Sequence, residues 1–331
     1  MSPLVLAAAS LALSGCEGPD AEDAPPEVDD ESPYESETPP ENDPRAAQSN
    51  GFILNGFILN GFVLNGFVLN GFVLNGADDP ADAIQITKVQ VNGGGKAEDT
   101  WLDGGNLHVL TKQGDVFAGT DLAGAKIDFE VDEGGKKKKK IRINDVTPVS
   151  PGSDLLAYDI DVKIEAGPWQ PLCSDAQGDP VDVLLIDGVW SGATGARVHE
   201  GVADRVTFAC RDAALAKCVE FGYVPWEALG GMTLDELHQA CTRMVRADYC
   251  GDGHAHTVNG TPIHILDQEG IQTADPNVSY VVEAEWGPNG ATCLNAANTR
   301  IAGTDPGCAL PSCGSDFASG GLLQSGTILA P

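Results

Sequence analysis

The amino-acid sequence predicts an α+β fold. A β-rich domain carries a helix pair stapled by a disulfide bond, and it follows a disordered tether and short five-residue repeats. From residue 83 onward, short runs of alternating apolar and polar residues recur, which is the pattern of half-buried strands. Two segments of this region have helical character, near 212–221 and from residue 233. Eight cysteines lie beyond residue 170, and an even number favours a disulfide framework.

The predicted strands begin near residues 84–91, where apolar side chains recur at strand spacing. A hairpin is expected where 126–131 alternates, turns through 132–135, and returns through 136–144. The return arm contains five consecutive lysines, residues 136–140. We interpret them as a solvated, charge-protected edge rather than an anion-binding patch, because the chain is otherwise acidic. Further strands are expected at 107–111, 116–118, 156–164, 181–186, 205–209, 261–266 and 280–286.

The second helix is predicted to start with a capping box, in which Thr233 and Glu236 each satisfy an otherwise unpaired backbone amide. His238 lies beside the apolar face of this helix, and we interpret it as a packing residue rather than a ligand. Residues 301–331 are rich in Gly, Ser and Cys and are expected to be a loop-like tail. The apolar face comprises Leu234, Leu237, Cys241, Met244 and Val245.

The cysteines beyond the N-terminal segment are expected to form disulfides, because the N-terminus described below indicates export to an oxidising compartment. Eight cysteines allow about 105 pairings, so most partners stay open. A bridge between Cys218 and Cys241 would staple the two helices, and Cys308 with Cys313 would close a local loop. The absence of a Cys-x-x-Cys pair argues against zinc ribbons and thioredoxin-like redox sites. The eight residues are Cys173, Cys210, Cys218, Cys241, Cys250, Cys293, Cys308 and Cys313.

The N-terminal residues predict a lipid anchor. An apolar run at residues 4–13 is too short to span a bilayer and fits the core of a signal peptide covering residues 1–15. It ends in Leu13-Ser14-Gly15-Cys16, an aliphatic and two small residues before a cysteine, which is the lipobox pattern. We expect cleavage before Cys16 and lipid on its thiol, with about 0.8 kcal/mol for each buried CH₂. The chain would then be a bacterial envelope lipoprotein, on the outer membrane or cell surface.

Between the anchor and the domain lie two unusual segments. Residues 16–49 hold twelve acids and many prolines, so we expect a disordered, extended stalk. Residues 50–76 hold five copies of Gly-Phe-Ile/Val-Leu-Asn, whose period of five matches neither a helix nor a flat strand. A self-association module, a coil docked on the next domain and flexible repeats are the open alternatives. We favour association or docking, because five exposed phenylalanines are otherwise unfavourable.

Composition limits the partners. The formal net charge of −30 at pH 7 repels phosphate backbones, so nucleic-acid binding is not expected. Apolar residues make up 42% of the chain, which is enough for residues 83–300 to form a globular domain. No cofactor is predicted. The expected partners are a membrane, reached through the lipid on Cys16, and another copy or the domain itself, reached through the repeats.

The densest polar cluster follows the second helix and is the candidate site. His-x-His places two rings on one side of an extended strand and could hold a metal, but a glycine-rich turn with solvated histidines is favoured, and no metal site is assigned. Asp248 is expected to pair with an arginine in a structural network. No Gly-x-Ser-x-Gly elbow indicates a hydrolase. The cluster comprises Arg243, Arg246, Asp248, Asp252, His254 and His256.

Part of this cluster resembles a known family. The stretch Cys-Thr-Arg-Met-Val-Arg-Ala-Asp-Tyr-Cys-Gly-Asp-Gly, residues 241–253, is similar to the signature of the ADYC domain, a bacterial family named after Ala-Asp-Tyr-Cys. Similar proteins also look like lipoproteins with Asn-Gly-containing repeats ahead of the domain. The family has no assigned activity, so the resemblance implies a fold unit without a function. It covers roughly residues 105–300 and extends to Cys210, Lys217-Cys218, Gly222-Tyr223-Val224-Pro225-Trp226, His256-Thr257 and Glu283-Ala284-Glu285-Trp286.

The leading functional prediction is a non-enzymatic, disulfide-stabilised binding or adhesion lipoprotein of the cell envelope. It predicts repeats that join a neighbour or the chain itself, and no pocket of converging polar groups. One alternative is a cell-envelope hydrolase, in which His256 lies within hydrogen-bond reach of Asp252 or Asp248. A second alternative is a metal-binding module at His254 and His256.

Overall fold

The structure is a computed structural model. The predicted signal peptide, Cys16, the tether and the remaining repeat positions lie outside the residues it describes. The described residues all lie in one structural unit, residues 45–331. In the described part of the chain, no helix has both the length and the hydropathy needed to cross a bilayer. The described residues are 52–54, 64–68, 73–75 and 83–328, without 133–135, 165, 176–177, 192–193, 199–204, 259, 275–278 and 315.

In the described part of the chain, the larger sheet has twelve strands, and its neighbouring strands are antiparallel. Its order is β2-β15-β12-β10-β9-β8-β4-β5-β6-β7, with β3 beside β4 and β11 beside β10. The short helix η2 (Gly119–Leu122) follows β7. The strands are β2 (Leu64–Val68), β3 (Val73–Asn75), β4 (Ala83–Val91), β5 (Gly95–Asp103), β6 (Asn106–Thr111), β7 (Val116–Ala118), β8 (Lys126–Asp132), β9 (Lys136–Pro148), β10 (Leu156–Ile164), β11 (Gln170–Pro171), β12 (Val183–Asp187) and β15 (Arg205–Cys210).

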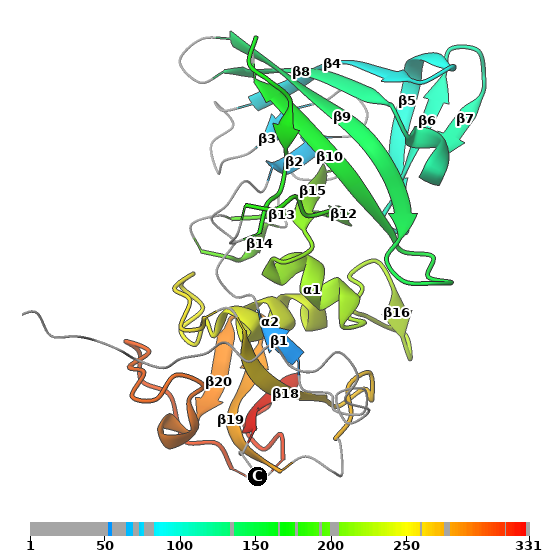
Figure 1. Cartoon of the computed structure of the whole chain (residues 1–331). Coiled ribbons are helices and arrows are strands. Elements are labelled where there is room, and N and C mark those ends of the chain that lie inside the picture. Colours follow the sequence, from blue (N-terminus) through cyan, green and yellow to red (C-terminus); the bar gives the residue numbers. More distant parts are fainter. Residues whose placement is uncertain are drawn as a thin grey trace, which may run out of the picture. The chain divides into compact units, whose positions relative to one another are not determined.

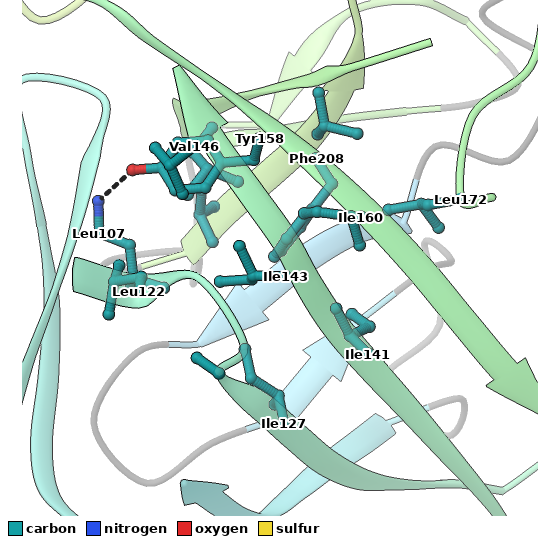
Figure 2. Packing of buried hydrophobic residues seen from close by; sticks show 14 of the residues in the cluster. Leu107, Leu122, Ile127, Ile141, Ile143, Val146, Tyr158, Ile160, Leu172 and Phe208 are labelled. Atoms are coloured by element: carbon teal, nitrogen blue, oxygen red, sulfur yellow. Dashed lines mark hydrogen bonds between the residues drawn. The ribbon is translucent and has the colours of Figure 1, made fainter. Parts of the chain in front are cut away.

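Alternation along the long strands builds the core of this sheet. Ile141 and Ile143 on β9 and Ile160 on β10 are buried in one cluster, as Figure 2 shows. Tyr158 of β10 is fully buried, and its hydroxyl accepts a hydrogen bond from the Leu107 amide of β6 at 3.0 Å (Figure 2). Burial raises the pKa of Tyr158 to about 12, although the bond from Leu107 opposes the shift. The predicted β8–β9 hairpin is confirmed, with Ile127 paired to Ile141.

The smaller sheet has the order β1-β18-β21-β19-β20. Its strand β21 lies between β18 and β19, so the prediction that residues 301–331 are all loop-like is wrong. This segment, Leu-Gln-Ser-Gly-Thr-Ile, has no simple alternation, because Gln324 and Ser325 are both buried. The strands are β1 (Phe52–Leu54), β18 (Thr261–Asp267), β19 (Tyr280–Gly287), β20 (Gly290–Leu294) and β21 (Leu323–Ile328).

Two helices pack between the sheets, as Figure 1 shows. Helix α1 (Ala214–Glu220) contacts β12 and β15, and helix α2 (Asp235–Arg246) contacts β19, β20 and β21. Leu237, Met244 and Val245 of α2 are buried in one cluster with residues of the smaller sheet, so the predicted apolar face is confirmed. The fold is therefore strand-rich with a pair of helices, as the sequence predicts.

The predicted capping box at α2 is wrong. The helix begins after Leu234, and no side chain caps its first turn. Thr233 lies in the short strand β17 (Met232–Thr233), which pairs with β16 (Ala228–Leu229), and its hydroxyl donates to Asp235 at 2.7 Å. Pairing in this small hairpin holds the threonine away from the helix amides. Another small pair is formed by β13 (Val189–Trp190) and β14 (Arg197–Val198), and η3 (Ala296–Asn298) follows β20.

All eight cysteines beyond residue 170 form disulfides. Cys218–Cys241 staples α1 to α2, as predicted, with a Cα–Cα distance of 5.7 Å. The predicted loop between Cys308 and Cys313 is wrong, because these two residues bridge to distant partners. Each native bridge is expected to stabilise the domain by about 2–4 kcal/mol, and such bridges indicate an extracytoplasmic compartment. The other pairs are Cys173–Cys210, Cys250–Cys308 and Cys293–Cys313.

Three short pieces of the repeats lie in strands at three places. β1 pairs with β18 in the smaller sheet, with Ile53 opposite Pro262. β2 pairs with β15 at the end of the larger sheet, and β3 pairs with β4. Backbone pairing therefore joins the repeat region to both sheets.

Candidate functional site

The Ala-Asp-Tyr-Cys segment begins where α2 ends. Ala247 adopts a left-handed conformation, with φ of 52°, which few residues other than glycine take up readily. Its amide donates to the carbonyl groups of Arg243 and Met244, which closes the last turn of the helix. The chain therefore turns sharply at Ala247 and directs Asp248 and Tyr249 into the interior.

Asp248 is completely buried, and both oxygens of its carboxylate accept hydrogen bonds. Arg243 donates to Asp248 Oδ2 in a buried ion pair. The backbone amide of Asp252 donates to Oδ1 at 3.1 Å, and that of Gly253 donates to Oδ2 at 3.0 Å. A buried carboxylate surrounded by an arginine and two amides fixes the turn that follows the helix.

The two arginines also bind backbone carbonyls. Arg243 Nε donates to Pro288 O at 3.1 Å, which connects α2 to the β19–β20 turn. Arg246 donates to Gly253 O, on the same turn that Asp248 holds. Burial lowers the pKa of Arg246, although attraction to Asp248 opposes the shift. Arg243, Arg246 and Asp248 therefore form the structural network that the sequence favours.

Tyr249 belongs to a second buried network. Its hydroxyl donates to Glu283 Oε1 at 2.7 Å. Arg300 Nη2 and the Ser325 hydroxyl both donate to Glu283 Oε2, at 2.7 and 2.8 Å. Arg300 Nη1 also donates to Met244 O at the end of α2, at 2.9 Å. This network ties the helix end to β19 and β21.

The charges of this second network stabilise each other. Burial alone raises the pKa of Glu283, but the attraction of Arg300 and the hydrogen bonds to the carboxylate outweigh it, so the pKa of Glu283 lies below its ordinary value. Burial raises the pKa of Tyr249, and the negative charge of Glu283 raises it further. Tyr249 is thus held as a neutral donor to an ionised carboxylate.

The Glu-Ala-Glu-Trp stretch completes this arrangement. The Trp286 indole stacks on Tyr249 with ring centroids 5.2 Å apart, and its Nε1 donates to the Ser325 hydroxyl at 2.8 Å. Glu285 Oε2 accepts the Ser319 amide at 3.0 Å, which holds the loop ahead of β21. Glu283, Trp286 and Ser325 are 34 or more positions from Tyr249 along the chain, yet they belong to the same buried network.

Cys250 and Gly251 fix the turn from outside. Cys250 bridges to Cys308. Gly251 has φ of +69°, and a Cβ built on it would lie 1.9 Å from Asn289 O. Only glycine fits this close approach of two backbones. Every residue from Ala247 to Gly251 therefore has a structural role.

The side chains of Asp252, His254 and His256 take no part in the hydrogen bonds of the two buried networks. The Asp252 and His254 side chains are 51% and 79% exposed, and they contact each other at 3.1 Å. The backbone hydrogen bond from His254 is the main reason that the pKa of Asp252 is lowered. The His256 ring packs on Tyr249, with centroids 5.6 Å apart, and its amide donates to Arg246 O.

The two chemical alternatives gain no support from this geometry. Among the described residues, the carboxylates of Asp248 and Asp252 pair with Arg243, His254 and backbone amides, and none of these hydrogen bonds reaches the His256 ring. The described residues contain no group of three His, Cys, Asp or Glu side chains placed to hold a metal ion.

His238 is a packing residue, as the sequence indicates. It is fully buried on α2, and its Nε2 lies 3.0 Å from Leu215 O of α1. Burial lowers the pKa of His238 to about 4. The neutral ring therefore joins α1 to α2 beside their disulfide.

A cavity that the sequence did not predict lies elsewhere in the domain. Its volume is about 300 Å³, and its walls come from the β5–β6 turn, the residues before β10 and the segment after α1. The leading prediction of no polar pocket is therefore wrong. A signal was present in the Trp226-Glu227 pair, but the opposing walls are far away in the sequence. The lining residues are Asp103, Gly104, Asn106, His108, Asp154, Leu155, Val224, Trp226 and Glu227.

The comparison with protein families agrees with this geometry. The family model of the ADYC domain matches residues 119–300, which is more than half of the chain. No curated protein and no solved structure matches the chain. The matched range contains α1, α2 and the charged residues of both buried networks, whereas Ser325 lies beyond it. The chain therefore belongs to the ADYC domain family.

Proposed function

We propose that this chain is a non-enzymatic adhesion lipoprotein of the bacterial envelope, anchored by lipid on Cys16 and self-associating through its repeats. The observation that carries the proposal is the pairing of three repeat pieces with three different strands, β18, β15 and β4. Edge strands present unpaired backbone groups and accept an added strand from any chain of suitable sequence.

The repeats are interchangeable, which favours exchange between copies. The five units differ only in Ile or Val at the third position, so a shift by five residues places the same sequence on the same edge. A repeat from a second copy then fits each edge as well as the chain's own repeat does. Exchange of identical elements is a low-barrier route to self-association. The acidic tether would give the anchored domain the reach to meet a neighbour.

Sedimentation of the full chain carrying Cys16→Ser tests self-association without the lipid. We expect reversible dimers or larger species whose fraction rises between about 1 and 100 μM, the range of weak, specific contacts. Replacing residues 51–75 with a Gly-Ser sequence of equal length should abolish the rise. The matched control replaces residues 17–41 in the same way and should still associate. If the chain with its natural repeats stays monomeric over the whole concentration range, the proposal is overturned.

Membrane fractionation tests the anchor. The unaltered chain should sediment with the envelope and partition into detergent, because two or more acyl chains hold a protein stably in a bilayer. Cys16→Ser should move it to the soluble fraction. Ser14→Thr, a neighbouring change that keeps the cysteine, serves as the control and should leave some chain membrane-bound. A Cys16→Ser chain that remains in the membrane would refute anchoring at this residue.

A further inference from the structure

The cavity beside Trp226 takes no part in the two buried networks. Its volume of about 300 Å³ lies at the lower end of the range for small-molecule sites. The walls come from three segments, which carry Asp103, Asp154 and Glu227. The three carboxylate groups are exposed, and none of them has an ion-pair partner among the described residues. The cavity is therefore a concave site of uncompensated negative charge, which concentrates cations.

The carboxylates of the cavity form no metal site of three protein ligands. Among the described residues, no three acidic, histidine or cysteine side chains approach closely enough to coordinate one ion, and those of the cavity are included. A cation that interacts with carboxylates on separate walls must be larger than a metal ion. An organic cation meets this condition.

The aromatic wall also fits an organic cation. Trp226 is partly exposed, and the turn at Gly105 holds it in place, since a Cβ there would lie 2.7 Å from the indole Cζ2. His108 is fixed on the other side by stacking on Trp101, with centroids 5.1 Å apart. An indole beside carboxylates recognises ammonium and guanidinium groups through cation–π and ionic attraction together.

One wall atom indicates that the ligand carries N–H donors. Asn106 Nδ2 donates to Asp154 O at 3.2 Å, which sets the orientation of the amide. Its Oδ1 is buried and has no hydrogen-bond partner in the described chain. Buried acceptors normally have a donor, so a ligand N–H group would satisfy this one after a small movement of the side chain.

We propose that the cavity binds a small molecule with a primary ammonium group, held by Trp226, Asp103, Asp154 and Glu227 and recognised by Asn106. The ammonium lies over the indole and donates to the asparagine oxygen and to a carboxylate of one wall, while the carboxylates of the other walls attract it at longer range. A quaternary ammonium has the same charge without N–H groups, so it binds more weakly. This site is independent of the repeats and of the lipid anchor.

Calorimetric titration of the full chain carrying Cys16→Ser with 1,4-diaminobutane tests the proposal. Saturable binding is expected, with Kd in the millimolar range or tighter, and tetramethylammonium should bind at least about fivefold more weakly. Trp226→Leu and Glu227→Gln should each weaken binding about tenfold, as expected for the loss of about 1.4 kcal/mol. Because Glu227 is exposed, Glu227→Gln keeps the domain folded even if Trp226→Leu does not.

Asp115→Asn is the matched control, because Asp115 is exposed on the β6–β7 turn and does not line the cavity. Its affinity for the diamine should equal that of the parent chain. Three results overturn the proposal: no saturable binding of the diamine, equal binding by the Glu227→Gln chain, or a calcium ion that binds at the same residues and displaces the diamine.

Discussion

Asp248→Asn is expected to lower the free energy of unfolding by about 3–5 kcal/mol, the usual effect of removing one partner from a buried ion pair. The substitution keeps the side-chain volume but leaves Arg243, 3% exposed, without its counter-charge. It also replaces one of the two oxygens that accept the amides of Asp252 and Gly253 with an amide donor. Urea denaturation followed by near-ultraviolet circular dichroism measures the effect, with disulfides intact.

Asp252→Asn is the control for this substitution. Asp252 is four residues away, its side chain is 51% exposed, and its contact with His254 lies at the surface. Surface ion pairs contribute about 0–1 kcal/mol, so the midpoint of unfolding should shift little. Equal losses in the two variants would contradict a special role for the buried carboxylate.

Glu283→Gln is expected to have the second large effect, also about 3–5 kcal/mol at neutral pH, because it leaves Arg300 buried without a charge partner. Since the pKa of Glu283 is lowered in the folded state, its stabilising contribution is complete above the unfolded value near 4.5 and is lost as the pH falls through the folded value. The difference in stability between the parent chain and the variant should therefore shrink below about pH 4.5.

Unfolding curves between pH 7 and pH 3 measure this difference. Glu269→Gln is the matched control, because Glu269 is exposed and takes no part in the network. That variant should follow the parent chain at every pH. A Glu283→Gln chain whose deficit stays constant from pH 7 to pH 3 would show that the charge of Glu283 does not provide the stabilisation.

The sequence predicts those elements whose periodicity is simple. The β8–β9 hairpin alternates around a glycine-containing turn, and helix α2 carries a continuous apolar face, so both could be predicted. Strand β5 could not be predicted in this way, because its sequence contains few apolar residues. The strand is held in place by its pairing with β6. Strand β21 was missed because polar residues of a central strand are buried here against other polar groups.

The site was predictable only where its parts are near in sequence. Arg243 and Asp248 lie five residues apart at the end of one helix, so their pairing follows from the local pattern. Glu283 binds Tyr249 and Arg300 only because β19 packs against α2. No local sequence pattern indicates the packing of this strand on this helix. The cavity at Trp226 combines segments around residues 103–108, 154–155 and 224–227, which the fold alone brings together.

The central claim is that the Ala-Asp-Tyr-Cys segment of this ADYC domain maintains the fold through the buried pair of Arg243 and Asp248. A double-mutant cycle with Arg243→Met and Asp248→Asn tests it most directly, with urea unfolding of the four chains as the measurement. Each single change leaves one buried polar partner unpaired, whereas the double change removes both charges, so we predict a coupling energy of at least about 2 kcal/mol. Effects that add within about 0.5 kcal/mol, with each single variant near parental stability, would contradict the claim.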